Sequence, residues 1–453
     1  MRNALPVILI ALPFASAAAL VVVGSWRIGT WINAASASLL FLLACLLPWH
    51  LRPEMSLLHV GEAEAHLVLL TSFVAMTTAW FSRSYTQAAL VARSFDRRRA
   101  RLHHVGCQAL TGAILLALLS DTPVLTWFAL TIAVSAATVV TGVVRSPAAT
   151  TAGSRLLVLC GVGLMLALLG TLLLYLAVEP HAATLRWSTL HALPHHAATL
   201  RLASFFLVIG YGALAGMAPL HSWLMEASAE AAAPGAILVS TLMVNAPLLI
   251  FMRLRFAVDL SPLLIALGLV TLLLGAACLV APANTRRTVA SAGMAQIGII
   301  VFGLGVGGPV ATFAGSLHMT VLALARAAVL QCHALPPTNS SARTCMAGAL
   351  ALALLPLFAL FLLAGVTLDQ SVWLMLPLAA GVLLTSLSLF VWLPKLTPPT
   401  IASRAAPTAP TAMTVGAAVG MTPIWLQFAL VLLLALAMPN PVADWFTAVA
   451  AAR

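Results

Sequence analysis

The sequence predicts an all-α polytopic membrane protein with about 14 transmembrane helices. Of its 453 residues, 62% are apolar and only 7% are charged, whereas roughly a quarter of the residues in a typical soluble domain are charged. The mean hydropathy is +1.07. Because so few polar residues cannot cover the surface of a soluble globule, the composition excludes a soluble globular protein, a disordered chain, a coiled coil and a disulfide-stabilised scaffold.

A transmembrane helix needs about 20 apolar residues, and the chain contains a series of apolar runs of that order. They cover approximately residues 5–24, 29–49, 60–80, 103–120, 123–144, 155–178, 200–218, 233–252, 262–281, 289–306, 309–331, 345–365, 371–394 and 421–438. We interpret the first run as a retained transmembrane helix and not as a signal peptide. Residues 396–412 are rich in Pro, Ala and Thr and predict a flexible loop.

The basic residues predict how the chain is oriented in a membrane. The sequence has 22 Lys and Arg against 11 Asp and Glu, a formal charge of +11. The basic residues lie mainly between apolar runs, which favours membrane topology over nucleic-acid binding. Because roughly twice as many of them fall on the side opposite the termini, we expect periplasmic termini in a bacterial inner membrane. The densest cluster, between Arg83 and Arg101, is interpreted as an inner loop against anionic lipids or as a docking site for a soluble partner.

No cofactor or metal site is expected in this chain. The six cysteines form no CxxC pair, and no iron–sulfur or zinc-ribbon motif is present. His191, His195 and His196 include an i,i+4 spacing that suits a metal, but Pro194 interrupts it. The sequence also lacks the glycine-rich and nucleophile motifs of soluble enzymes, so we expect no catalytic residue here.

One segment departs from the pattern of a plain transmembrane helix. It runs from Gly210 to Ser240 as GYGALAGMAPLHSWLMEASAEAAAPGAILVS. Pro removes a helical hydrogen bond, and such breaks survive at membrane depth only where buried polar groups satisfy the backbone. We therefore predict a broken helix near residues 210–235. It marks an ion or substrate path, or it is a re-entrant hairpin without transport.

This segment, extended to Arg255, resembles the signature of the antiporter-like subunits of respiratory complex I, Mrp antiporters and group 4 membrane hydrogenases. In that family a glycine-containing block precedes P-x-H-x-W-L. The segments NTRRTVASAGMAQIGIIVFGLGVGG (284–308) and LHMTVLALARAAVLQ (317–331) resemble two further family patterns. The resemblance is closest to the hydrogenase-4 component F type and is best over residues 100–335. It implies one antiporter-like transmembrane domain over residues 1–453, with inverted repeats.

The resemblance also implies a buried axis of Glu, Lys and His in the members that pump protons, and this chain departs from that axis. Thr131 stands at the position of the family's Glu on the fifth helix, and Leu214 at that of the Lys on the broken helix. Leu322 replaces a family His and Arg326 the neighbouring Lys. A buried Lys can release its proton, whereas Arg effectively cannot. We therefore predict that proton translocation is lost or strongly altered.

Five residues remain candidates for a proton or ion path: His221, His318, Arg326, Glu226 and Glu230. His221 is a relay or a polar residue that holds the break, and His318 is a relay or an interhelical hydrogen-bonding group. Arg326 is a functional cation, a clamp on the carbonyl end of a broken helix, a snorkelling side chain or the holder of an anion. Glu226 and Glu230 gate an entrance or face water.

The sequence leaves several functions open. We expect an antiporter-like membrane subunit of a multi-subunit energy-converting complex, related to complex I or group 4 hydrogenases. Its partners would be lipids and other membrane and soluble subunits, and catalysis would belong to subunits that carry flavin, iron–sulfur or nickel. One alternative is the membrane subunit of an inorganic-carbon (CO2 or bicarbonate) accumulation complex with a zinc-containing soluble partner. A non-transporting scaffold and a stand-alone secondary transporter are further alternatives.

Overall fold

The computed structural model describes residues 4–51, 57–91, 95–144, 146–178, 185–188, 190, 197–280, 284–334, 357–396, 413–436 and 438–451. These residues form sixteen α-helices and one short 3-10 helix, and no β-strand is found among them. In chain order the helices are α1 (Leu5–Val22), α2 (Trp26–Ala44), η1 (Leu47–His50), α3 (Glu62–Val91), α4 (Arg97–Leu119), α5 (Pro123–Gly142), α6 (Pro147–Ala177), α7 (Ala197–Leu214), α8 (Ser222–Glu230), α9 (Ala233–Leu254), α10 (Ser261–Val280), α11 (Thr285–Val306), α12 (Gly308–His333), α14 (Leu357–Gln370), α15 (Val372–Leu396), α16 (Met413–Leu436) and α17 (Asn440–Ala451).

The predicted all-helical membrane fold is confirmed. Ten described helices are long and apolar enough to cross a membrane, and the pair α16 and α17, bent by 80°, would make eleven. Helices α7, α14 and α15 contribute shorter apolar segments. Each predicted apolar run overlaps one of these helices. Residues 345–356 of one run and residues 397–412 of the predicted loop lie outside the described part of the chain, whereas residue 396 ends α15.

Two helices begin well before their apolar runs, which corrects the prediction that the arginine cluster forms a loop. Helix α4 begins at Arg97, because the Asp96 side chain accepts a hydrogen bond from the Arg99 amide at 2.8 Å. Helix α6 begins at Pro147, where Ser146 caps the first turn. Most of the described arginines of the cluster therefore lie on the first turns of α4.

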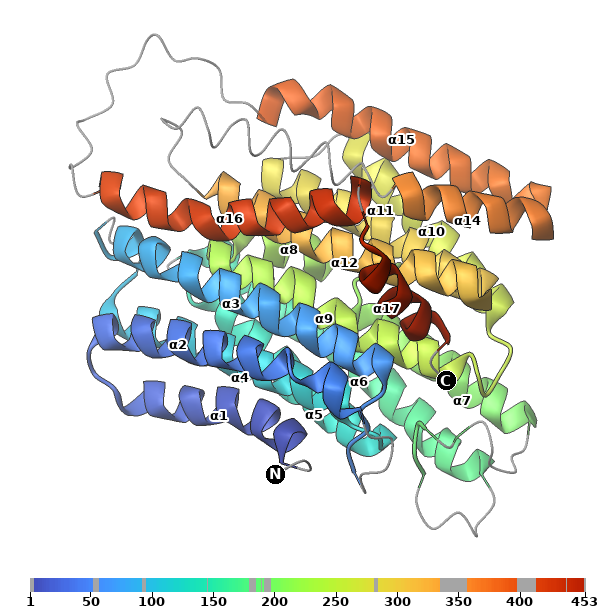
Figure 1. The fold of residues 1–453 in the computed structure, drawn as a ribbon, viewed down its shortest axis with the longest axis horizontal. Coiled ribbons are helices and arrows are strands. Elements are labelled where there is room, and N and C mark those ends of the chain that lie inside the picture. Colours follow the sequence, from blue (N-terminus) through green and yellow to red (C-terminus); the bar gives the residue numbers. More distant parts are fainter. Residues whose placement is uncertain are drawn as a thin grey trace.

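The helices run mostly alongside one another, so the bundle has two ends (Figure 1). At the first, which we call the terminal end, α1 and α3 begin. Helix α17 lies at the same end, because its Trp445 donates to His66 in the second turn of α3 at 3.3 Å. At the second, which we call the arginine end, α4 and α6 begin, and the exposed Arg97 and Arg98 lie there. Both described chain ends therefore belong to the terminal end.

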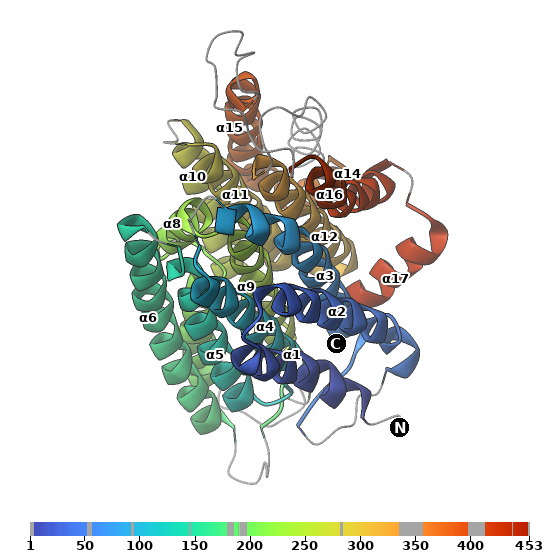
Figure 2. The ribbon, with the colours of Figure 1, turned by 90° about the vertical axis from the view of Figure 1, so that its left-hand side faces the viewer.

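Helix α9 is the centre of the bundle. It is apolar on all sides and almost wholly buried, as expected of a helix that is surrounded by other helices. It contacts α3, α4, α5, α7, α8, α11 and α12. Figure 2 shows α6 and α15 towards the edges of the same bundle.

Small residues set the distance between the most closely packed helix pairs. A Cβ on Gly163 of α6 would lie 2.6 Å from the carbonyl oxygen of Gly210 on α7. Likewise, a Cβ on Gly268 of α10 would lie 2.5 Å from the amide nitrogen of Phe302 on α11. Such close backbone approach is typical of membrane helices, where small residues allow extensive van der Waals contact.

We expect Gly163→Ala to destabilise the protein by about 1–3 kcal/mol, because the added methyl group collides with the α7 backbone. Gly161, on the same helix, is the matched control. No atom lies within 4 Å of a Cβ placed there, so Gly161→Ala should be neutral or stabilise by up to about 1 kcal/mol. Unfolding of the two purified variants in the same detergent measures the difference, and equal stabilities would contradict this account of the packing.

Candidate functional site

The broken helix predicted near residues 210–235 is confirmed. Helix α7 ends at Leu214, and α8 begins only at Ser222. Between them, Gly216 has a φ of 76°, a left-handed conformation that favours glycine, and the Ala218–Pro219 peptide is cis. A second interruption separates α8 from α9, which starts at Ala233 with Pro234 in its first turn.

Side chains from three helices satisfy the backbone around the break. The Trp223 indole of α8 donates to the Ala213 carbonyl of α7 at 2.7 Å. Thr271 of α10 accepts a hydrogen bond from the Ala218 amide at 3.2 Å. At the far end of α8, Arg286 of α11 donates to the carbonyls of Ala229 and Ala231, at 3.1 and 2.7 Å. These three side chains hold the break, and the titratable His221 lies within it, at the N-cap position of α8.

Three of the four positions that the resemblance aligns with the family axis, Thr131, Leu214 and Leu322, carry no ionisable side chain, and the fourth is Arg326. Leu214, the last residue of α7, is fully buried and belongs to the hydrophobic core. Leu322 of α12 is also buried in that core. The Thr131 hydroxyl of α5 donates to the Trp127 carbonyl of its own helix at 3.0 Å. These side chains provide packing or a local hydrogen bond, and none of them can exchange a proton near neutral pH.

Arg326 is a buried cation in the half of α12 nearer the arginine end. Its side chain is 4% exposed, and one guanidinium nitrogen donates to the Ser240 carbonyl of α9. The other two nitrogens, Nε and Nη2, have no partner among the described residues. The predicted clamp thus acts on a carbonyl inside α9, and not on the carbonyl end of the broken helix, because Arg286 occupies that end.

The other candidate residues lie in two separate places. His318 of α12 is fully buried, and neither ring nitrogen has a partner in the described structure. His221 is half-buried at the N-cap position of α8 and makes no capping hydrogen bond with its side chain. Glu226 and Glu230 are half-buried on α8, where Glu226 pairs with Arg155 of α6.

Four further buried histidines were not predicted from the sequence, and the first, His59, lies 3.9 Å from a carboxylate oxygen of Glu64. His66 is fully bonded: Trp445 donates to Nδ1, and Nε2 lies 2.9 Å from the Thr320 hydroxyl of α12. His103 and His104 of α4 have ring centroids 5.6 Å apart, and the Nδ1 atom of each has no described partner. The only signal for this pair was its sequence adjacency just after the arginine cluster.

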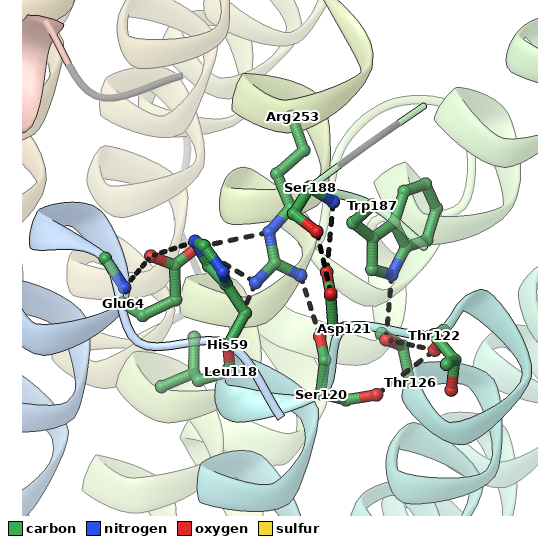
Figure 3. A network of polar contacts seen from close by, with 11 residues as sticks. His59, Glu64, Leu118, Ser120, Asp121, Thr122, Thr126, Trp187, Ser188 and Arg253 are labelled. Atoms are coloured by element: carbon green, nitrogen blue, oxygen red, sulfur yellow. Dashed lines mark hydrogen bonds and ion pairs between the residues drawn. The ribbon is translucent and has the colours of Figure 1, made fainter. Parts of the chain in front are cut away.

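A buried ion pair at the terminal end was also missed, and Figure 3 shows its surroundings. Arg253 of α9 donates to one carboxylate oxygen of Glu64 on α3, through Nη2 at 2.9 Å and Nε at 3.2 Å. Its Nη1 atom donates to the Ser120 carbonyl at the end of α4, 3.0 Å away. The second oxygen of Glu64 accepts from the Gly61 amide at 3.0 Å. One side chain therefore ties together α3, α4 and α9.

The same end carries a second polar network and a cavity. Asp121 accepts hydrogen bonds from the Ser188 amide at 3.0 Å and from the Ser188 hydroxyl at 2.7 Å (Figure 3). A cavity of about 210 Å³ lies beside it, lined by Glu64, Arg253 and Trp187 among others. The described residues include no group of three or more His, Cys, Asp or Glu side chains that could hold a metal. His191, His195 and His196 lie outside the described residues.

We expect Arg253→Gln to cost about 3–5 kcal/mol of stability, because it leaves the Glu64 carboxylate buried without its charge partner. The Glu64 and Arg253 side chains are only 6% and 10% exposed. The double variant Glu64→Gln/Arg253→Gln should cost less than the sum of the two single variants.

The Arg155–Glu226 pair is the matched control, since the Arg155 side chain is 59% exposed. Glu226→Gln should therefore cost less than about 1 kcal/mol. A double-mutant cycle by denaturant unfolding tests both pairs, and strict additivity at Glu64 and Arg253 would contradict the coupling.

Comparisons with known proteins agree with the helical membrane architecture. Residues 120–393 match the family described as NADH:quinone oxidoreductase/Mrp antiporter, TM. The hydrogenase-4 component F homolog of Methylacidiphilum infernorum is 32% identical over 330 residues, which is 70% of this chain and 69% of that protein. Formate hydrogenlyase subunit 3 of Escherichia coli is 39% identical over 105 residues, or 22% of this chain and 17% of that protein.

Two solved structures share the fold over nearly the whole chain. A chain of the membrane-bound sulfane sulfur reductase, an archaeal respiratory membrane complex, superposes with a TM-score of 0.82 at 17% identity, covering 100% of this chain and 97% of that one. A chain of the Mrp complex from Dietzia sp. DQ12-45-1b gives a TM-score of 0.81 at 17% identity, covering 99% and 97%. The family match and the relative from Methylacidiphilum establish that this chain belongs to the NADH:quinone oxidoreductase/Mrp antiporter transmembrane family, as an antiporter-like membrane protein.

Proposed function

We propose that the chain is a membrane subunit of a multi-subunit energy-converting complex and that its own proton translocation is lost or strongly altered. The observation that carries the second part is the broken helix, which is retained with the apolar Leu214 at its edge. A proton relay needs a group that changes its charge, and such groups are costly in a membrane unless they function. Here the break keeps its shape, position 214 carries no such group, and His221 is the titratable residue within the break.

The proposal that the chain works within a hetero-oligomer rests on its relatives. Hydrogenase-4 component B and formate hydrogenlyase subunit 3, both of Escherichia coli, are named as parts of larger enzymes. The two solved relatives come from membrane complexes. Redox catalysis would then take place on partner subunits. The concentration of Arg at one end of the bundle supports a cytoplasmic arginine end, with periplasmic termini in a bacterial inner membrane.

We expect liposomes that contain the purified chain to show no more proton flux than empty liposomes under an imposed potential. The buried His318 has no described partner, and no ionisable side chain occupies position 214 or 322 to pass a proton along the axis. A pH-sensitive dye inside the liposomes measures the flux. Protein-dependent flux that falls in a His318→Gln variant would contradict the loss of translocation.

The scaffold alternative is distinguished in the assembled complex. If the chain only holds other subunits together, His221→Gln should leave the activity of the complex unchanged, because glutamine is polar and can replace the hydrogen bond of His221 to the Pro219 backbone. A normally assembled complex without activity would show that the membrane subunit takes part in the reaction. Blue native electrophoresis and activity of the same sample provide the two readings.

A second candidate function is inorganic-carbon accumulation with a zinc-containing soluble partner. The observation that favours it is the arginine end, where Arg97 and Arg98 are exposed on the first turn of α4. Exposed guanidinium groups of this kind suit an acidic protein surface. Redox subunits in the purified complex would favour the first function, whereas a single large zinc-containing protein would favour the second.

We expect the double variant Arg97→Glu/Arg98→Glu to reduce recovery of a soluble partner by at least about tenfold, since the charge reversal replaces attraction by repulsion. Arg27→Glu is the matched control, because Arg27 is also exposed at the arginine end but lies at the start of α2. Quantitative mass spectrometry after gentle detergent extraction measures the recovery. Equal losses in both variants would assign the effect to general electrostatics and contradict a docking site on α4.

A further inference from the structure

Arg326 carries a positive charge in the membrane interior that no group described in this chain neutralises. It points between two buried helices: one nitrogen donates to Ser240 of α9, and the guanidinium lies against Gly293 of α11. A Cβ at Gly293 would come within 1.7 Å of Nη2, so the guanidinium occupies the space that glycine leaves. Ser240 and Gly293 each follow the start of their helix by about two turns, which places the guanidinium about 10 Å inside the arginine end.

The partners of Arg326 do not balance its charge. A helix carbonyl is neutral overall, and the Nε and Nη2 atoms remain without a described partner. Arg keeps its proton under all ordinary conditions, so the site cannot neutralise itself. A buried charge without a counter-charge is strongly unfavourable, and proteins avoid it by pairing.

Each described carboxylate that has an arginine partner pairs with an arginine other than Arg326. No described Asp or Glu lies in the interior of a membrane-spanning helix. The buried Glu64 pairs with Arg253 at the opposite end, and Glu226 pairs with Arg155. The sequence from 335 to 356 contains no Asp or Glu. Because α9, α11 and α12 are almost wholly covered by other helices, a carboxylate of a partner protein does not reach the site from outside.

We infer that Arg326 binds a small exchangeable monovalent anion, of the size of chloride or bicarbonate, between α9, α11 and α12. The unpartnered Nε and Nη2 atoms are the donors. Gln331, five residues nearer the arginine end of α12, is fully buried with both amide atoms unpartnered in the described structure. Orphaned polar atoms of this kind indicate water, which a small anion needs on its way to the site. Anion binding is independent of whether the chain moves protons.

Anion-dependent stability of the purified protein tests this site. The protein is held in gluconate at constant ionic strength, and chloride or bicarbonate is exchanged in while the melting temperature is recorded. Binding to the folded state alone produces a saturable rise in stability. We expect Arg326→Met to abolish the rise, and Gly293→Ala to weaken the apparent affinity at least about tenfold by displacing the guanidinium. Of chloride and bicarbonate, the anion that saturates the rise in stability at the lower concentration is the one that the site prefers.

Arg27→Met is the matched control, because Arg27 is exposed and its loss should leave the anion dependence unchanged. If Arg326→Met does not fold, the wild-type protein crystallised in bromide replaces it, and an anomalous peak within hydrogen-bond distance of the Arg326 guanidinium is expected. A wild-type protein insensitive to both anions, an anion effect that survives Arg326→Met, or water alone at the guanidinium would each overturn the inference.

Discussion

Lipid offers no hydrogen bonds to a polypeptide, so the unwound chain between Leu214 and Ser222 persists only because other helices provide partners. Trp223 and Thr271 do so through an indole and a hydroxyl, and Arg286 holds the far end of α8 through its guanidinium. All three side chains keep their charge state near neutral pH. None of these three contacts involves a relay residue. A chain with leucine at position 214 keeps the architecture of its family because the shape and the proton chemistry rest on different side chains.

The two buried arginines illustrate what the membrane interior demands of a fixed charge. Arg253 lies near the terminal end, where the Glu64 carboxylate and two backbone carbonyls use all three of its nitrogens. Arg326 lies deeper and has one carbonyl. The same chain thus shows that its fold can bring a carboxylate to an arginine. The missing counter-charge is therefore specific to the position of Arg326. A diffusible anion accounts for it better than a general tolerance of buried charge does.

Local sequence patterns predicted the helices and the break, because apolar run length and proline spacing act over short distances. The departures from the family axis rest on the resemblance and stay a prediction. Helix starts were less accurate. Caps at Asp96 and Ser146 extend α4 and α6 into polar sequence beyond the apolar runs. The Glu64–Arg253 pair could not be predicted, since its members are 189 residues apart and meet only through tertiary packing. The Trp445–His66 contact, across 379 residues, was missed for the same reason.

This fold persists across widely different sequences. A TM-score of 0.82 at 17% identity means that helix positions persist while most side chains change. Close glycine contacts such as Gly163 against Gly210 fix those positions by backbone sterics, and they remain whether or not an ion moves nearby. The shared fold therefore carries no information on proton movement, which depends on the groups in the interior. In the interior, Leu214 at the break and the unneutralised charge of Arg326 favour a fixed electrostatic role over one in which a residue changes its protonation state.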